Sequence, residues 1–483
     1  MSNERYIKNY INGTLMPAIS GNYLDTINPA TGKAYAQFPD SGTEDVEQAI
    51  TYAEQALVEW QATESERRFR ILMRIADIIE QNAIAYARAE AVDTGKPLAM
   101  SISQDIPGAQ AFFRYYAGTL FHFKDRAKQQ ESNLMHYRIR QAVGLVACIL
   151  PPHMPLYSLC KKVAPALAMG NCVIVKPAQY TPMTAYLLAR DLEHAGLPKG
   201  VLNIVQGKDE SLIDALVQHP KIQAIAYTGR SLRGKQIIEK AATQHKKLAL
   251  TMGGNNPNII FADCNFDQMM IGTLRASFSN NGQLKHHASR ILVQRDLYPK
   301  LKAELVKRAQ FIKIGDPFAA ITDLGALLSQ DHLEDMEKLL QLAEVEGANL
   351  LCGGNRVEKE GELKGGYFFR PTVLENLPNT SYLNQKEIFG PLVTLQIFDT
   401  EEEALALANA TTYGLSASIW TQDISKANRF AQRLRAKTIW INAWLTDNKD
   451  LSTGGIYGSN LASQGGSASL DFFSEAKEIC VKY

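Results

Sequence analysis

A lysine and two histidines follow one another at Lys285, His286 and His287. A lysine amine can attack a carbonyl carbon, but its ordinary pKa of about 10.4 must first fall by several units through burial or neighbouring cations. An imidazole titrates near neutral pH and can move a proton or bind a metal ion. The same three side chains also suit a solvated loop without chemistry, and that interpretation stands beside the reactive one.

A glycine-containing turn at residues 227–234 is the second place where residue types and spacing suggest binding. Gly229 and Gly234 lie on either side of Arg230. The turn follows an apolar run and opens a helical pattern, so free backbone N–H groups at the helix start would bind a phosphate group. Arg230 would either pair with that anion or fill the groove. The spacing alone is weak evidence.

The elements that would position these residues follow an α/β rhythm. Short apolar runs alternate with helical patterns of about ten to fifteen residues between residues 144 and 252, which predicts βαβ units and a parallel sheet. The expected strands are residues 145–150, 172–175, 201–205, 222–227 and 248–252. A helix is expected from Thr43, whose hydroxyl would cap it. Its buried face would carry Val46, Ile50, Ala53, Leu57 and Trp60.

A second α/β region is expected after Gly254. It has strand patterns at residues 258–261 and 290–293 and a helical pattern at residues 331–347, and it continues to residue 441. Two further segments, residues 132–140 and 476–483, are predicted to be strands that can pair as an arm between subunits.

Composition excludes several classes of function. The 483 residues include 51 basic and 50 acidic side chains, so a broad basic face for nucleic acid or anionic lipid is not expected. No apolar run reaches the roughly 18 residues of a membrane span. No apolar segment follows the charged start of the chain, and six dispersed cysteines form no CxxC pair, which favours a cytoplasmic protein with reduced thiols. Small molecules and copies of itself are the expected partners.

The chain resembles the aldehyde dehydrogenase family along nearly its whole length. The motifs that carry the resemblance include Tyr10-Ile11-Asn12-Gly13, Asn28-Pro29-Ala30-Thr31-Gly32, Gly282-Gln283, Glu387-Ile388-Phe389-Gly390-Pro391 and Ile479-Cys480-Val481-Lys482. Thr94-Gly95-Lys96-Pro97-Leu98-Ala99 is most similar to the branch that oxidises muconic semialdehydes. The resemblance implies a homodimer or homotetramer whose subunit has three parts: a dinucleotide-binding domain (residues 1–121 and 143–253), a catalytic-type domain (254–465) and an oligomerisation arm (122–142 and 466–483).

The resemblance also implies a site for NAD or NADP. Lys176 stands where the family's lysine reaches the adenosine ribose, and Gln179 replaces the glutamate that accepts hydrogen bonds from both ribose hydroxyls. Loss of that negative charge would weaken selection against a 2′-phosphate. The turn against the dinucleotide is formed by Gly229, Arg230 and Gly234, with Arg230 in place of a serine. Glu387 would hold the nicotinamide ribose, and Phe389 would pack near the ring.

Three positions that carry the family's chemistry differ in this chain. Lys285 replaces the cysteine nucleophile, Thr251 replaces the glutamate base, and His153 replaces the asparagine that holds the oxyanion. Threonine cannot act as a general base near neutral pH, and histidine donates to an oxyanion only in the right tautomer. Lys162 matches a family lysine implicated in proton relay.

We therefore expect a family member that has lost aldehyde oxidation and retains binding of a nucleotide or a small aldehyde. An adduct on Lys285 would end as an amide, which resists hydrolysis. A protonated Lys285 would disfavour the positively charged oxidised nicotinamide more than the neutral reduced ring.

A second hypothesis is a working enzyme, either an NAD(P)-dependent oxidoreductase with rearranged residues or one that carries out ester or imine chemistry on Lys285. A relocated thiol such as Cys160, placed against the nicotinamide, would overturn the hypothesis of lost oxidation. A third is an assembly subunit that binds no ligand. The three histidines His153, His286 and His287 would together suit a metal ion, but no carboxylate partner is evident, so no metal is expected.

Overall fold

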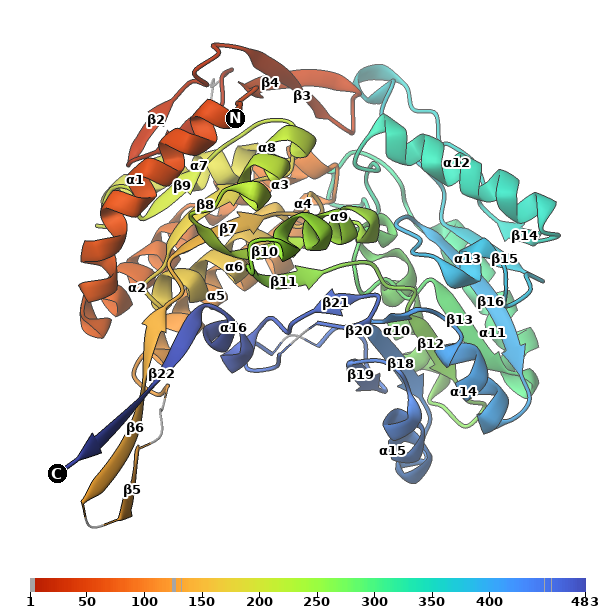
Figure 1. Ribbon diagram of the computed structural model, residues 1–483. Helices are drawn as coiled ribbons and strands as arrows, with labels where there is room; N and C mark the ends of the chain where they lie inside the picture. Colours follow the sequence, from red (N-terminus) through yellow and green to blue (C-terminus); the bar gives the residue numbers. More distant parts are fainter. Residues whose placement is uncertain (1–4, 124–126, 132, 447, 453) are drawn as a thin grey trace.

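The computed structural model describes residues 5–123, 127–131, 133–446, 448–452 and 454–483 (Figure 1). Residues 1–4 of the charged N-terminal segment and residue 132 of the predicted arm lie outside the described residues. Two large sheets, each flanked by helices, make up most of the fold, so the predicted α/β class is confirmed.

The first sheet has eight strands in the order β2-β1-β9-β8-β7-β10-β11-β21. Its five central strands are parallel: β9 (Leu202–Ile204), β8 (Cys172–Lys176), β7 (Leu145–Ile149), β10 (Ile222–Thr228) and β11 (Lys247–Thr251). They are the five strands expected from the sequence, and each end differs by at most one residue. The antiparallel edge strands are β1 (Asn9–Ile11), β2 (Thr14–Met16) and β21 (Asn460–Leu461). Every residue of β7, β8 and β9 is buried, as in a parallel sheet covered on both faces.

Helices pack on this sheet and on one another (Figure 1). Those that contact its strands directly include α1 (Thr43–Ala62), α6 (Pro155–Ala168), α7 (Met183–Asp191) and α8 (Asp209–Gln218), and α9 (Ser231–Ala242) packs on α8. Further helices pack around α6: α2 (Ser65–Gln81), α3 (Ala83–Thr94) and α5 (Ile106–Thr119), the last preceded by α4 (Leu98–Met100) and a π-helical turn at Ser101–Asp105. A hairpin of β3 (Tyr23–Asn28) and β4 (Lys33–Pro39) lies beside them.

The helix predicted from Thr43 begins there, but its predicted cap is wrong. Thr43 is already the first helical residue, and the capping position is Gly42, which has no side chain to accept a hydrogen bond. Asp45 takes over instead, because its Oδ2 accepts the Gly42 N–H at 3.0 Å from the third helical position. The predicted inner face is buried at four of its five positions, and Leu57 is half-buried.

The second sheet has seven strands in the order β14-β15-β16-β13-β12-β18-β19, parallel except for β14 against β15. The strands are β14 (Asn349–Cys352), β15 (Thr372–Glu375), β16 (Leu392–Phe398), β13 (Arg290–Gln294), β12 (Pro257–Ile260), β18 (Ser416–Trp420) and β19 (Thr438–Ile441). Neighbouring residues of β12 point to opposite apolar clusters. Ile260 packs with α10 (Phe266–Phe278) and α11 (Tyr298–Phe311), whereas Ile259 packs with α14 (Glu401–Asn409) and α15 (Ile424–Arg433). The predicted helix at residues 331–347 is α12 (Gln330–Val345).

A three-stranded arm extends from the body of the chain (Figure 1). It is formed by β5 (Ala127–Glu131), β6 (Leu134–Ala142) and β22 (Ser474–Lys482), and β22 pairs antiparallel with β6 along its whole length. The two segments predicted to pair therefore do so. The stretch before β22 does not join the arm, because α16 (Gly466–Phe472) packs on α6 and β21 closes the first sheet. None of the helices in the described part of the chain is both long and apolar enough to cross a membrane.

Candidate cofactor groove and catalytic position

A cavity of about 1080 Å³ lies at the carboxyl ends of the first sheet's strands. Most of its wall comes from residues 149–153 at the end of β7, the turn at residues 227–233 after β10, helix α12 and residues 386–389, and α8, Tyr180, Lys285 and Tyr413 contribute the rest with other residues. A crevice beside the carboxyl ends of parallel strands is where open α/β sheets bind ligands, and the volume is at the upper end of the range for small-molecule sites. The cavity is the candidate functional site.

The predicted turn forms one wall of this cavity, and its two glycines pack closely against neighbouring side chains. A Cβ on Gly229 would lie 2.1 Å from the Tyr227 Oη, and one on Gly234 would lie 2.4 Å from the Met252 Sδ. Helix α9 starts directly after Arg230, and no side chain caps its first turn. The Arg230 side chain is 73% exposed and its Nη2 lies 3.6 Å from the Asp335 Oδ2 on α12. Arg230 therefore stands at the rim and does not plug the groove.

The residues predicted for the adenosine ribose gather around an aspartate that the sequence analysis did not identify. Lys176 ends β8, and its buried Nζ donates hydrogen bonds to the Pro177 carbonyl at 2.7 Å and to the Asp209 Oδ1. Burial lowers the pKa of Lys176, and Asp209 opposes that shift. Gln179 and Asp209 exchange two hydrogen bonds of 3.2 Å between side chain and backbone. Asp209, the first residue of α8, also lines the cavity.

Lys285, at the predicted nucleophile position, forms an ion pair with Glu387, the residue predicted to hold the nicotinamide ribose. The Lys285 Nζ lies 3.0 Å from the Glu387 Oε1 and 2.9 Å from the Gly229 carbonyl oxygen. It also lies 5.5 Å from the centre of the Phe389 ring. The two charged side chains are only 9% and 15% exposed. This contact joins the loop before β13 to the glycine turn of the first sheet.

Thr251, at the predicted base position, is the last residue of β11 and does not line the cavity. Its carbonyl accepts the Gly229 N–H at 3.1 Å, so its backbone shapes the turn. Two residues further on, a Cβ on Gly253 would lie 2.5 Å from the Glu387 Oε2. Glycine at this position leaves room for the carboxylate of Glu387 against the first sheet.

His153, at the predicted oxyanion position, lies beside Phe389 in the cavity wall. The two ring centres are 5.4 Å apart, with the rings edge to face. His332 lies in the first turn of α12, and the centre of its ring is 5.4 Å from the centre of the same phenyl ring. Burial, followed by the charge of Lys285, holds the pKa of His153 well below its usual range. A neutral imidazole has one N–H, so His153 can donate a single hydrogen bond into the cavity.

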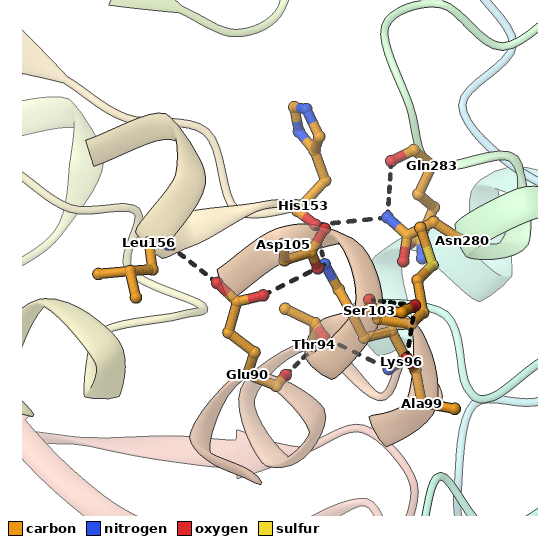
Figure 2. A network of polar contacts seen from close by, with 11 residues as sticks. Glu90, Thr94, Lys96, Ala99, Ser103, Asp105, His153, Leu156, Asn280 and Gln283 are labelled. Atoms are coloured by element: carbon orange, nitrogen blue, oxygen red, sulfur yellow. Dashed lines mark hydrogen bonds and ion pairs between the residues drawn. The ribbon is translucent and has the colours of Figure 1, made fainter. Parts of the chain in front are cut away.

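The backbone around His153 is held by a buried ionic network (Figure 2). The Lys96 Nζ lies 2.6 Å from the Asp105 Oδ2 and 3.5 Å from the Glu90 Oε2, and none of these side chains is exposed. Lys96 also donates to the His153 carbonyl at 2.8 Å, and Glu90 accepts the Leu156 N–H at 3.0 Å. Burial, despite the attraction of Lys96, raises the pKa of Glu90. The network therefore holds the backbone of this loop in place.

Lys162, the predicted relay lysine, lies in α6 and outside the residues that line the cavity. Its Nζ donates to the Gln464 Oε1 at 3.0 Å, and burial lowers its pKa to about 7. Cys160, the candidate relocated thiol, is also fully buried in α6, and burial raises its pKa well above the usual range. Such a thiol is inert rather than nucleophilic, so the interpretation of Cys160 as a replacement nucleophile is wrong.

The histidines of the lysine loop have separate partners. The His286 Nδ1 lies 3.1 Å from the Ser416 Oγ, and the His287 Nδ1 lies 3.1 Å from the Ile388 carbonyl oxygen. Burial lowers the pKa of His286 to about 3 and that of His287 to about 4. Within the described ranges, no three histidine, cysteine, aspartate or glutamate residues are grouped so that they could hold a metal ion.

Comparisons with known proteins match this architecture. Residues 16–479 match the aldehyde dehydrogenase family. The 2-aminomuconic semialdehyde dehydrogenase of Bos taurus is 38% identical, over 99% of this chain and 98% of its own length. The 2-hydroxymuconic semialdehyde dehydrogenase of Pseudomonas sp. (strain CF600) is 36% identical, over 99% of both chains.

Solved structures agree with these sequence matches. Betaine aldehyde dehydrogenase from Staphylococcus aureus in complex with NAD⁺ is similar with a TM-score of 0.96 and 33% identity, covering 98% of this chain and 94% of that one. The NAD⁺ complex of an aldehyde dehydrogenase from Bacillus cereus has a TM-score of 0.96 and 32% identity, covering 99% and 96%. These two structures with the same fold were therefore solved with the dinucleotide bound.

Proposed function

Because this chain belongs to the aldehyde dehydrogenase family, we propose that it is a dinucleotide-binding member that does not oxidise aldehydes by a thiol route. The observation that carries the proposal is the ion pair between Lys285 and Glu387, with its 3.0 Å contact. An ammonium that donates to a carboxylate and to a carbonyl has no free lone pair with which to attack an aldehyde.

Two other positions support the loss of turnover. Acyl transfer to water needs a base that activates the water and a donor that holds the oxyanion. Thr251 supplies no base. His153 retains one N–H, which could orient a carbonyl oxygen. The arrangement suits binding of a small aldehyde better than its repeated conversion.

The residues around the groove fit a nicotinamide dinucleotide. When bound, such a cofactor supplies a hydride acceptor or donor. The uncapped first turn of α9 and the two close-packed glycines suit a pyrophosphate. Lys176 and Gln179 would lie at the adenosine end, and Glu387 and Phe389 at the nicotinamide end. The carboxylate at that end is already paired with Lys285, so binding of the nicotinamide half competes with this ion pair.

Calorimetry with NAD⁺, NADH and NADP⁺ tests the binding half of the proposal, and steady-state assays with a panel of aldehydes test the catalytic half. We expect measurable binding of at least one dinucleotide and no sustained turnover. Failure of all three nucleotides to bind would favour an assembly subunit instead.

An active semialdehyde oxidoreductase is the second candidate, and one observation favours it. The relatives named above as semialdehyde dehydrogenases span nearly the whole chain at 36–38% identity. Such an enzyme would depend on Lys285 or on another rearranged residue. Turnover of a semialdehyde that Lys285→Ala abolishes would establish this second candidate and overturn the first.

The remaining features of the proposal concern organisation. We assign residues up to 121, 143–253 and 460–473 to the dinucleotide-binding part, 254–459 to the catalytic-type part, and the arm strands to contact between copies in a homo-oligomer. The predicted boundary at residue 465 changes because β21 and α16 pack with the first sheet and its helices. The six free cysteines suit a reducing, cytoplasmic compartment.

A further inference from the structure

The adenosine end of the groove contains a carboxylate that the family resemblance does not place there. Asp209 begins α8 and lines the cavity with a side chain that is 42% exposed. Its Oδ1 accepts hydrogen bonds from the Lys176 Nζ and from the Gln179 backbone N–H. Among the described residues, none donates a hydrogen bond to its Oδ2. One oxygen of this carboxylate is therefore bonded within the protein, and the other remains available to a ligand.

Gln179 is held in place by the same aspartate. The Gln179 Oε1 accepts a hydrogen bond from the Asp209 backbone N–H at 3.2 Å. In return, the Gln179 backbone N–H donates to the Asp209 Oδ1. The reciprocal pair fixes the Gln179 side chain against the start of α8. Asp209 thus stands beside Gln179 and supplies the negative charge that glutamine lacks.

Two of the cations near this position are bonded within the protein, and a third, Arg230, is 73% exposed and lies 3.6 Å from the Asp335 Oδ2. Lys176 is 1% exposed and bonded to Asp209, so it offers little free positive charge to a ligand. Arg233, which also lines the cavity, has its Nη2 3.0 Å from the Asp214 Oδ1 and donates to the Glu210 carbonyl oxygen at 2.8 Å. A 2′-phosphate on the adenosine ribose would meet the Asp209 Oδ2, while Lys176 and Arg233 already have partners within the protein.

We propose that Asp209 is the residue that selects a nucleotide with a free 2′-hydroxyl over a 2′-phosphorylated one, and so favours NAD over NADP. This inference rests on the proposed nucleotide binding. A ribose hydroxyl can donate to the Asp209 Oδ2, whereas a phosphate can only accept and is repelled. This proposal reverses the prediction from the sequence, which is that the loss of charge at Gln179 weakens selection against a 2′-phosphate.

Calorimetry with two small probes tests the inference on the full chain. The probes 5′-AMP and adenosine 2′,5′-bisphosphate differ at the 2′ position and do not reach Lys285, so the nicotinamide end does not affect the result. We expect 5′-AMP to bind the unaltered chain at least about tenfold more tightly. In Asp209→Asn, which keeps the shape and removes the charge, we expect the bisphosphate to gain affinity until this ratio falls to about one.

The matched control is Glu334→Gln, which removes another cavity-lining carboxylate, on α12, and should leave the ratio unchanged. Equal binding of both probes to the unaltered chain would overturn the inference without any variant, as would an unchanged ratio in a folded Asp209→Asn. In either case the chain still binds nucleotides, and the proposed function survives. If neither the probes nor the dinucleotides bind, both proposals fail together.

Discussion

The Lys285 Nζ lies 3.0 Å from the Glu387 Oε1, and this ion pair joins two positions that the family resemblance assigns to different tasks. One is the nucleophile position and the other is the carboxylate for the nicotinamide ribose. Their pairing couples the residue at the nucleophile position to the state of the cofactor groove. A ligand that uses the Glu387 Oε1 must compete with Lys285, and any chemistry at Lys285 must first break the ion pair.

A double-mutant cycle measures the strength of this pair. Both side chains are largely buried, so we expect a coupling of about 1–3 kcal/mol between Lys285→Met and Glu387→Gln, from urea unfolding of the four proteins. The control cycle uses Arg433 and Glu402, whose side chains are 51% and 70% exposed and should couple by less than about 1 kcal/mol. A coupling at Lys285 no larger than that of the control would mean that the pair is not a stable feature of the fold.

Once a bound nicotinamide ribose displaces Glu387 from Lys285, the charge of Lys285 should bias the groove toward reduced cofactor. The oxidised nicotinamide ring carries a positive charge and the reduced ring does not, so we expect NADH to bind about tenfold more tightly than NAD⁺. Lys285→Met should remove this preference. Lys338→Met, which removes a 70% exposed cavity-lining lysine, should preserve it. Calorimetric titration with both nucleotides gives the ratio directly, and a preference for NAD⁺ would contradict the expectation.

Restoring the thiol alone should not restore turnover. In Lys285→Cys the chain regains a nucleophile, but Thr251 still supplies no base to activate water. We expect a burst of one product per chain from this variant, followed by only a slow background steady-state rate. Adding Thr251→Glu should raise the steady-state rate by about a hundredfold, a typical contribution of a general base.

The single variant Thr251→Glu serves as the control for this experiment and should remain inactive. Equal steady-state rates of Lys285→Cys with and without Thr251→Glu would show that the residue at position 251 does not limit deacylation.

The buried lysine in α6 should give a measurable pH dependence of stability. Burial lowers the pKa of Lys162 to about 7 from its ordinary value of 10.5. Between these values the unfolded chain binds a proton that the folded chain has released. Lys162 therefore makes folding stability rise with pH, by up to about 1.4 kcal/mol per pH unit.

Lys162→Met should remove this rise between about pH 7 and pH 10. Loss of the hydrogen bond from Lys162 to the Gln464 Oε1 would shift the whole curve without changing its slope. Lys235→Met, at an exposed position of α9, should keep the slope of the unaltered chain. Urea unfolding across the pH range checks all three proteins, and an identical slope in Lys162→Met would refute the assignment.

Most of the fold could be predicted because it depends on local patterns. Buried runs of β-branched residues identify the central strands, and a parallel sheet covered on both faces makes those runs almost wholly apolar. The cap of α1 could not be predicted from the sequence. A shift of one residue in the start of the helix decides whether Thr43 or Asp45 caps it. The packing of α16 on α6 joins segments far apart in the chain and leaves no local pattern.

The site could be predicted only in part for the same reason. The motifs place Lys285 and Glu387 in functional segments, but they lie 102 residues apart, and nothing local indicates that they pair. Asp209 lies 30 residues from Gln179, and its role appears only when α8 is placed beside β8. The signal available for His332 was its position in the first turn of a predicted helix, which gives no indication that α12 faces Phe389.

The number of product molecules formed per chain tests the central claim most directly. The unaltered chain is incubated with excess aldehyde, semialdehydes included, and excess NAD⁺, and the reduced cofactor is counted against the amount of protein. We predict no more than one reduced cofactor per chain at any time. Continued formation of many equivalents, lost in Lys285→Ala, would contradict the claim that this pocket binds without turning over.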